Sequence, residues 1–125
     1  MRRVVIADDS QTSRMIIRRC LEIIGFKGVE FHEVNDGSEA LTMLKNLGDV
    51  DLLVTDLNMP KMGGELLLKA VKEDAKLAAL PVVVITSAGN PAKEAELIGH
   101  GAICICNKPV SPATLYQKLK SFIQE

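Results

Sequence analysis

The sequence predicts a doubly wound α/β domain in which a five-stranded parallel sheet is covered by five helices, giving three layers. Short apolar runs alternate with segments of helical periodicity along the whole 125-residue chain. The runs are apolar at successive positions, which is typical of strands that are buried on both faces. Such strands occur in parallel sheets with helices on each side, so the two observations together indicate this architecture.

Four apolar runs and one weaker, mixed segment at 29–34 predict the strands, and two of the apolar runs end abruptly in acidic residues. They comprise residues 4–7, 29–34, 52–55, 82–86 and 102–106. The run at 82–86 gives the strongest strand signal, because Pro81 introduces consecutive β-branched residues.

Five segments carry apolar residues three or four positions apart, which predicts helices. They comprise residues 11–24, 38–47, 64–73, 91–98 and 112–123. Gly25 and Gly48 follow the first two segments, and we expect these helices to end there. Pro91 and Pro112 open the last two, where proline suits the first turn.

The composition excludes several classes of partner. The formal net charge is −1 and basic residues are dispersed, so no patch for nucleic acid or an anionic membrane stands out. Aromatic residues make up 3% of the chain, which leaves no platform for stacking bases. The N-terminal apolar run is too short for a signal peptide, and no stretch is long enough to span a membrane. We therefore expect a cytoplasmic protein that binds neither nucleic acid nor membrane.

Three cysteines, Cys20, Cys104 and Cys106, are present without a C-x-x-C spacing. We expect them to be small buried hydrophobic residues in a reducing compartment. Cys104 and Cys106 are two positions apart in a predicted strand, so they should point to the same face.

Conspicuous polar residues stand at the ends of four predicted strands. Asp8 and Asp9 follow the first, Asp56 the third, Thr86 ends the fourth, and Lys108 follows the fifth. Ligands of doubly wound sheets bind outside the carboxyl ends of the strands. If these four strands are neighbours, all five residues converge on one edge of the sheet.

Three crowded carboxylates require compensation, since each pair about 4 Å apart costs roughly 4 kcal/mol at an effective dielectric constant near 20. Either one carboxyl is protonated or a cation lies among them. The site offers only oxygen ligands, which selects Mg²⁺, with Mn²⁺ as a substitute. Together with the Thr86 hydroxyl and the Lys108 ammonium, such a site suits a transferring phosphoryl group. Asp56 is the natural nucleophile, because an aspartyl carboxylate can form an acyl phosphate.

Four motifs then identify a family. They are Asp8-Asp9, the stretch Asp-Leu-Asn-Met-Pro-Lys-Met-Gly-Gly at 56–64, Ile-Thr-Ser-Ala at 85–88, and Lys108-Pro109. In this order and spacing they resemble the response regulator receiver domains of bacterial two-component signalling, in particular the single-domain, chemotaxis-regulator-like subclass. The resemblance covers residues 1–125 and implies one receiver domain without an output domain. It also implies a flavodoxin-like fold with strand order 2-1-3-4-5, and makes the Lys108–Pro109 bond a candidate for the cis form.

The resemblance implies a role for each site residue. Asp56 would accept a phosphoryl group from a histidine kinase or phosphotransfer domain. Asp9 and Asp56 would bind Mg²⁺ through side chains, Asn58 through its backbone carbonyl, and Asp8 mainly through water. Lys108 would pair with the phosphoryl oxygens. The protein would catalyse its own phosphoryl transfer and slow self-dephosphorylation without being a turnover enzyme.

Signalling, by the same resemblance, would begin when Thr86 swings inward to the phosphoryl group. A downstream protein would then bind the face formed by the fourth helix, fifth strand and fifth helix. We expect a monomer, with dimerisation on activation left open. Ile105 stands where receivers usually carry an aromatic ring, which argues against gating by a ring. Asn58 and Ala88 occupy positions that tune phosphoryl lifetime, and Ala88 cannot position an attacking water, so we hypothesise slow self-hydrolysis.

Two local alternatives remain open. Asp8 and Asp9 could cap the first helix, whose N-terminus favours negative charge. Ser87 could carry the switch hydroxyl instead of Thr86, although the spacing to Lys108 favours Thr86.

Three other functions are less compatible with these residues than a phosphoacceptor. Haloacid-dehalogenase-type phosphatases need a second Asp two residues after the nucleophile, where this chain has Asn58. A flavodoxin-like FMN-binding protein needs a Ser/Thr/Gly-rich loop after the first strand, where Asp8 and Asp9 would repel the phosphate. A receiver-fold module that never takes phosphate has no need of the acidic triad with Thr86 and Lys108.

Overall fold

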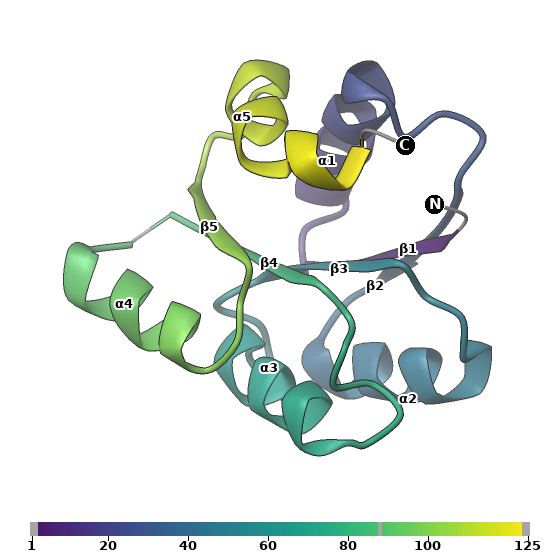
Figure 1. Ribbon diagram of the computed structural model, residues 1–125, viewed down its shortest axis with the longest axis vertical. Helices are drawn as coiled ribbons and strands as arrows, with labels where there is room; N and C mark the ends of the chain where they lie inside the picture. Colours follow the sequence, from purple (N-terminus) through teal and green to yellow (C-terminus); the bar gives the residue numbers. More distant parts are fainter. Residues whose placement is uncertain (1–2, 88, 124–125) are drawn as a thin grey trace.

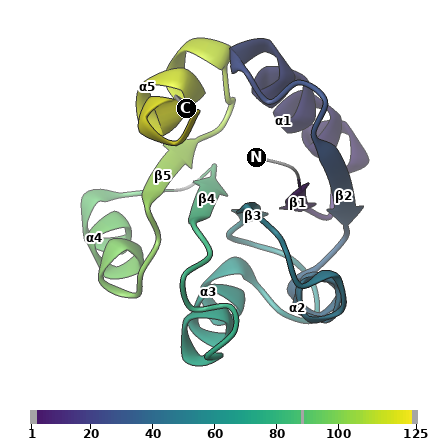
Figure 2. The ribbon, with the colours of Figure 1, turned by 45° about the vertical axis from the view of Figure 1, so that its right-hand side comes forward.

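The computed structural model describes residues 3–87 and 89–123, and it contains five parallel strands alternating with five helices. The strands are β1 (Arg3–Ala7), β2 (Glu30–Val34), β3 (Leu52–Asp56), β4 (Val82–Thr86) and β5 (Cys104–Asn107). The helices are α1 (Gln11–Ile24), α2 (Gly37–Leu47), α3 (Gly64–Glu73), α4 (Pro91–Gly99) and α5 (Pro112–Ile123). The strand order is β2-β1-β3-β4-β5. Both the predicted fold class and the order implied by the resemblance are confirmed. Figure 2 shows the strands in this order, from β5 on the left to β2 on the right.

The helices form two layers around the sheet (Figure 1): α1 and α5 cover one face, and α2, α3 and α4 cover the other. Each face has its own hydrophobic cluster. Successive residues of the central strands enter opposite clusters, so Val83 packs towards α1 and α5 while Val82 and Val84 pack towards the other layer. Every residue of β3 and β4 is buried. This is why these strands are apolar at nearly every position.

The start of the fifth strand differs from the prediction of 102–106, since β5 begins at Cys104. The backbone N–H of Ala102 donates to the carbonyl of Leu97 at 3.1 Å, which assigns Ala102 to the turn that closes α4. Gly101 makes this turn with a φ of 110°, a conformation that other residues rarely adopt. The remaining element boundaries differ from the predicted ones by one residue at most.

The third strand includes Asp56 as its last residue, where the sequence placed the aspartate just after the strand. Asp56 is in register with Ile85 of β4, and the N–H of Leu57 donates to the carbonyl of Ile85 at 3.0 Å. The hydrogen-bond ladder therefore fixes the backbone of Asp56.

The cysteines are free thiols, and Cys20 and Cys106 are buried as expected. Cys104 is only half-buried, which corrects that expectation for one of the three. Cys104 and Cys106 pack against the same cluster, on the side of α1 and α5, so their common face is confirmed. Within the described ranges, no helix combines the length and apolar character needed to cross a membrane.

Candidate functional site

Three carboxylates meet at the carboxyl edge of the sheet. Asp8 follows β1 and is completely buried, Asp56 ends β3 with 7% of its surface exposed, and Asp9 is exposed. One carboxylate oxygen of each lies within 4.8 Å of the others. This proximity follows from the topology, since β1 and β3 are hydrogen-bonded neighbours and both strands run towards this edge.

Asp8 is held in place by several polar contacts. Its N–H continues the sheet by donating to the carbonyl of Val34 at 3.1 Å. Its Oδ1 accepts a hydrogen bond from the N–H of Ser10 at 2.9 Å, and its Oδ2 accepts one from Nζ of Lys108 at 3.1 Å. The N-cap of α1 is Ser10, whose side chain accepts from the N–H of Ser13. The capping alternative for Asp8 and Asp9 is therefore not needed to explain the start of this helix.

Lys108 comes from a loop 100 residues further along the chain than Asp8. Its N–H donates to the carbonyl of Thr86 at 2.9 Å, and its peptide bond to Pro109 is cis, as the resemblance suggested. The ammonium lies 3.1 Å from Asp8 and 3.4 Å from Oδ1 of Asp56. One ammonium thus bridges two buried carboxylates.

The electrostatics of the cluster leave Asp56 short of compensating charge. Burial raises the pKa of the Asp56 carboxyl and the charge of Asp8 raises it further, whereas Lys108 acts in the opposite direction without cancelling them. For Lys108, burial acts to lower the pKa, but the hydrogen bond to Asp8 and the charge of Asp56 outweigh it, so the pKa is raised. Three carboxylates face one ammonium, and the arrangement favours a further cation.

Comparison with known proteins decides the family. The family model of the response regulator receiver domain matches residues 4–120 of this chain. The chain belongs to the response regulator receiver family. The receiver is 38% identical over 122 residues to the chemotaxis protein CheY-3 of Vibrio cholerae serotype O1, covering 98% of this chain and 92% of that protein. The resemblance inferred from the motifs is confirmed.

Solved structures show the same likeness. The receiver is similar to the chemotaxis response regulator CheY4 of Vibrio cholerae, with 30% identity, a TM-score of 0.83, and 97% and 98% of the two chains covered. It is also similar to a chain of the CheX–CheY complex with BeF₃ and Mg²⁺ from Borrelia burgdorferi, with 25% identity and a TM-score of 0.86. That match covers 99% of this chain and 90% of the other. Receivers are signalling domains of two-component systems rather than metabolic enzymes.

The donor set of the receiver fits a hard divalent cation. Asp8, Asp9 and Asp56 supply only carboxylate oxygens, the ligands that Mg²⁺ prefers. Asn58, predicted to contribute its backbone carbonyl, lies exposed two residues beyond the end of β3. The individual roles of these residues stay predictions.

The predicted switch residues share one face of the sheet. Thr86 is 1% exposed at the end of β4 and continues the alternation of Val82 and Val84. Ile105 of β5 is 4% exposed and packs in the cluster under α2, α3 and α4. It is in register with Val84, two positions before Thr86. The neighbouring Ser87 is exposed, and Ala88 lies outside the described residues.

The sequence did not reveal the supporting role of Arg14, and it indicated for Gly64 only that the next helix needs room to start. Arg14 of α1 donates to the backbone carbonyl of Asp8 and, at 2.9 Å, to Oδ1 of Asn35. Gly64 begins α3, and a Cβ built on it would lie 2.2 Å from the backbone oxygen of Asp56. No feature of the sequence distinguishes Arg14 from the other arginines of its helix. The two glycines at 63–64 indicate a tight helix start, but not which of them contacts Asp56.

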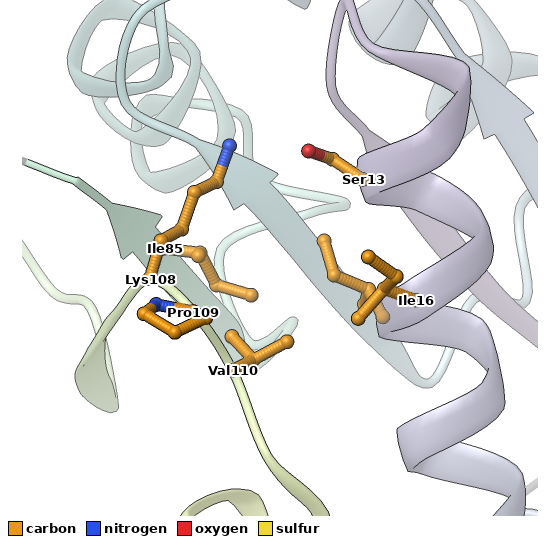
Figure 3. Close-up of a pocket in the computed structure, with 7 residues that line it drawn as sticks. Ser13, Ile16, Ile85, Lys108, Pro109 and Val110 are labelled. Carbon is orange, nitrogen blue, oxygen red and sulfur yellow. The ribbon is translucent and has the colours of Figure 1, made fainter.

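An apolar pocket of about 280 Å³ opens beside Lys108, between α1 and the segment that follows β5 (Figure 3). Ile16 of α1 faces Pro109 and Val110 across it, with Ile85 between them. Ile17 also lines the pocket. Ile16 is 47% exposed at its rim. The opening next to the carboxylates is therefore flanked by apolar surface on the side of α1.

A second cluster of metal-ligating groups joins α3 to α4: Glu65, Glu96 and His100. Nζ of Lys93 lies 3.1 Å from Glu65 and 2.7 Å from Glu96. These carboxylates already share an ammonium, so the group is a surface ion-pair network.

Proposed function

We propose that this receiver accepts a phosphoryl group on Asp56 in a Mg²⁺-dependent reaction and signals by binding a partner when phosphorylated. The observation that supports this most is the buried carboxylate of Asp56, held between Asp8, Asp9 and the ammonium of Lys108. Membership of the receiver family supports the same reaction class.

Each residue has a distinct part in the proposed reaction. Asp56, fixed by the β3–β4 ladder, presents its carboxylate oxygen to the phosphorus of the donor. Lys108 moves its ammonium from the carboxylate to a phosphoryl oxygen, a short displacement because Nζ is already 3.4 Å from Asp56. When bound by Asp9, Asp56 and the carbonyl of Asn58, with Asp8 acting mainly through water, Mg²⁺ would neutralise charge on the carboxylates and the phosphoryl oxygens.

Partner binding is assigned to the surface of α4, β5 and α5. Thr86 and Ile105 share the buried face next to α4, so an inward movement of Thr86 changes the space available to Ile105. Ile105 has no ring to expose, and we infer that the signal is a repacking beneath α4. Ile98 of α4 and Tyr116 of α5 are 47% and 40% exposed and supply apolar contact area for a partner. The phosphoryl donor would be a histidine kinase or phosphotransfer domain.

Labelling in the presence and absence of metal tests this function. The protein is incubated with acetyl phosphate and Mg²⁺, quenched in acid and weighed by intact-protein mass spectrometry. We expect one phosphoryl group per chain with Mg²⁺ or Mn²⁺, and at least a tenfold lower yield with EDTA or with Ca²⁺, which prefers larger coordination shells. Equal labelling with and without a divalent metal would contradict the proposal.

A further inference from the structure

The apolar pocket between α1 and the segment after β5 adjoins the phosphoryl site. Ile16 and Ile17 stand three and four positions after Ser13 on α1, so these side chains share one face of the helix. This face forms one wall of the pocket. Pro109 and Val110, which follow β5, form the opposite wall (Figure 3).

One end of this pocket is polar and the other is apolar. Figure 3 shows the Ser13 hydroxyl and the Lys108 ammonium at the same end. The side chains of Ile16 and Val110 lie farther from that end. The ammonium is 3.4 Å from Oδ1 of Asp56, so the polar end adjoins the carboxylate proposed to accept the phosphoryl group. A matching ligand is therefore anionic at one end and apolar at the other.

The size and lining of the pocket restrict the apolar part of such a ligand. The volume of about 280 Å³ lies just below the range of about 300–1,000 Å³ that suits drug-sized ligands, so a short chain fits better. Apart from Ser13 and Lys108, the lining residues that the structure describes are aliphatic, and none offers an aromatic ring on which a nucleobase could stack. These features favour a short aliphatic chain over a nucleotide.

We propose that this pocket holds the acyl chain of a small phosphodonor, so that butyryl phosphate is preferred to acetyl phosphate. The inference rests on the proposed phosphoacceptor function and names a class of donor for the same site. The phosphoryl group of the acyl phosphate lies between Asp56 and the ammonium of Lys108, and the chain extends along Ile16 and Val110. Charge at one end of the donor and apolar surface at the other are then both matched.

The transfer needs no further reactant. A bond forms between the phosphorus and a carboxylate oxygen of Asp56, while the bond between the phosphorus and the acyl oxygen breaks. The electron pair of the broken bond leaves on the carboxylate of the released butyrate, with no proton transferred and no change in oxidation state. The chain contacts the pocket before and during this step, so it raises the second-order rate constant of labelling at donor concentrations below saturation.

Initial labelling rates with the two donors test this inference. Full-length protein with Mg²⁺ is mixed with acetyl phosphate or butyryl phosphate at equal low concentrations, quenched in acid at intervals and weighed by intact-protein mass spectrometry. Burial of the additional methylenes favours the longer donor, but the pocket is open at its rim, where Ile16 is 47% exposed. We therefore expect butyryl phosphate to label the wild type about fivefold faster than acetyl phosphate.

Ile16→Ala removes part of one wall, so the ratio of the butyryl to the acetyl rate should fall by about twofold or more. Because intrinsic donor reactivity is the same for every protein, the change in this ratio isolates the pocket. The side chain is half-exposed, so its truncation is tolerated by the fold. Ile23→Ala is the matched control: Ile23 is 56% exposed on the same helix and is not among the described residues that line the pocket. Its ratio should equal that of the wild type.

Four results would count against the inference. Equal labelling of the wild type by both donors would overturn it and leave a segment of a donor protein as the occupant of the pocket. An unchanged ratio in Ile16→Ala would place the preference elsewhere, and an equal fall in Ile23→Ala would attribute it to the packing of α1. Absence of labelling by either donor would contradict the phosphoacceptor function itself, whereas labelling without preference contradicts the pocket assignment alone.

Discussion

The Asp56→Asn variant is expected to take up no phosphoryl group from acetyl phosphate and Mg²⁺, under conditions that label the wild-type chain. An amide is not nucleophilic enough to form an acyl phosphate, and it also removes an anionic ligand from the cluster. Because no other residue replaces the nucleophile, the loss should be complete within the sensitivity of intact-protein mass spectrometry. Labelling of Asp56→Asn at more than about one hundredth of the wild-type rate, a barrier difference below ~3 kcal/mol, would place the acceptor elsewhere.

Asp49→Asn is a matched control, since Asp49 is exposed in the loop between α2 and β3 and should be labelled like the wild type. Loss of fold is not expected to explain the effect at position 56. Burial and the charge of Asp8 raise the pKa of Asp56, so its ionised form opposes folding above that pKa, and the penalty disappears as the pH falls towards the unfolded value. Asparagine carries no charge. In EDTA at neutral pH the variant should therefore unfold at the same urea concentration as the wild type, or a higher one.

Gly64→Ala is expected to destabilise the receiver by about 1–3 kcal/mol, the usual cost of forcing an extra carbon into a packed site. The new Cβ would lie 2.2 Å from the backbone oxygen of Asp56 and 3.0 Å from Cα of Leu57. Both are backbone atoms, so neither can rotate away as a side chain would. The N–H of Gly64 also donates to the carbonyl of Leu57 at 2.9 Å, and this contact holds α3 against the end of β3. Urea unfolding measures the loss.

Gly99→Ala provides the comparison, because a Cβ there would have no atom within 4 Å, and Gly99 ends a helix as Gly64 begins one. This variant should be as stable as the wild type or slightly more stable, since alanine is favoured over glycine in helices. If Gly64→Ala and Gly99→Ala unfold at the same urea concentration, the close approach of α3 to Asp56 does not limit which residue can stand at position 64.

The fold could be predicted because the sequence contains both continuous apolar runs, which indicate buried strands, and apolar residues at helical spacing. Runs such as residues 82–85 are apolar at every position, which is typical of strands whose two faces are both covered by helices. Neighbouring strands cannot be read from such runs, and the order came from the resemblance. The start of β5 was misplaced because Ala102 is apolar for a different reason: it is buried in the turn that ends α4.

Site residues could be predicted where a reactive or charged side chain stands at the end of a strand. Asp8, Asp56 and Lys108 each stand at a strand end, and parallel strands bring these ends together. The contact of Arg14 with the carbonyl of Asp8 depends on how α1 packs, and nothing local signals it. The common face of Cys104 and Cys106 follows from strand alternation, whereas the partial exposure of Cys104 depends on how the helices cover β5.

If Asp8, Asp9, Asp56 and Lys108 act as one Mg²⁺-dependent phosphoryl site, a crystal structure with Mg²⁺ and beryllofluoride will show it most directly. We predict beryllofluoride on the carboxylate of Asp56 and the Lys108 ammonium on one of its fluorines. An octahedral ion should lie about 2.0–2.1 Å from oxygens of Asp9, Asp56 and the carbonyl of Asn58. Beryllofluoride absent from Asp56, or the ion bound by other residues, would contradict the account.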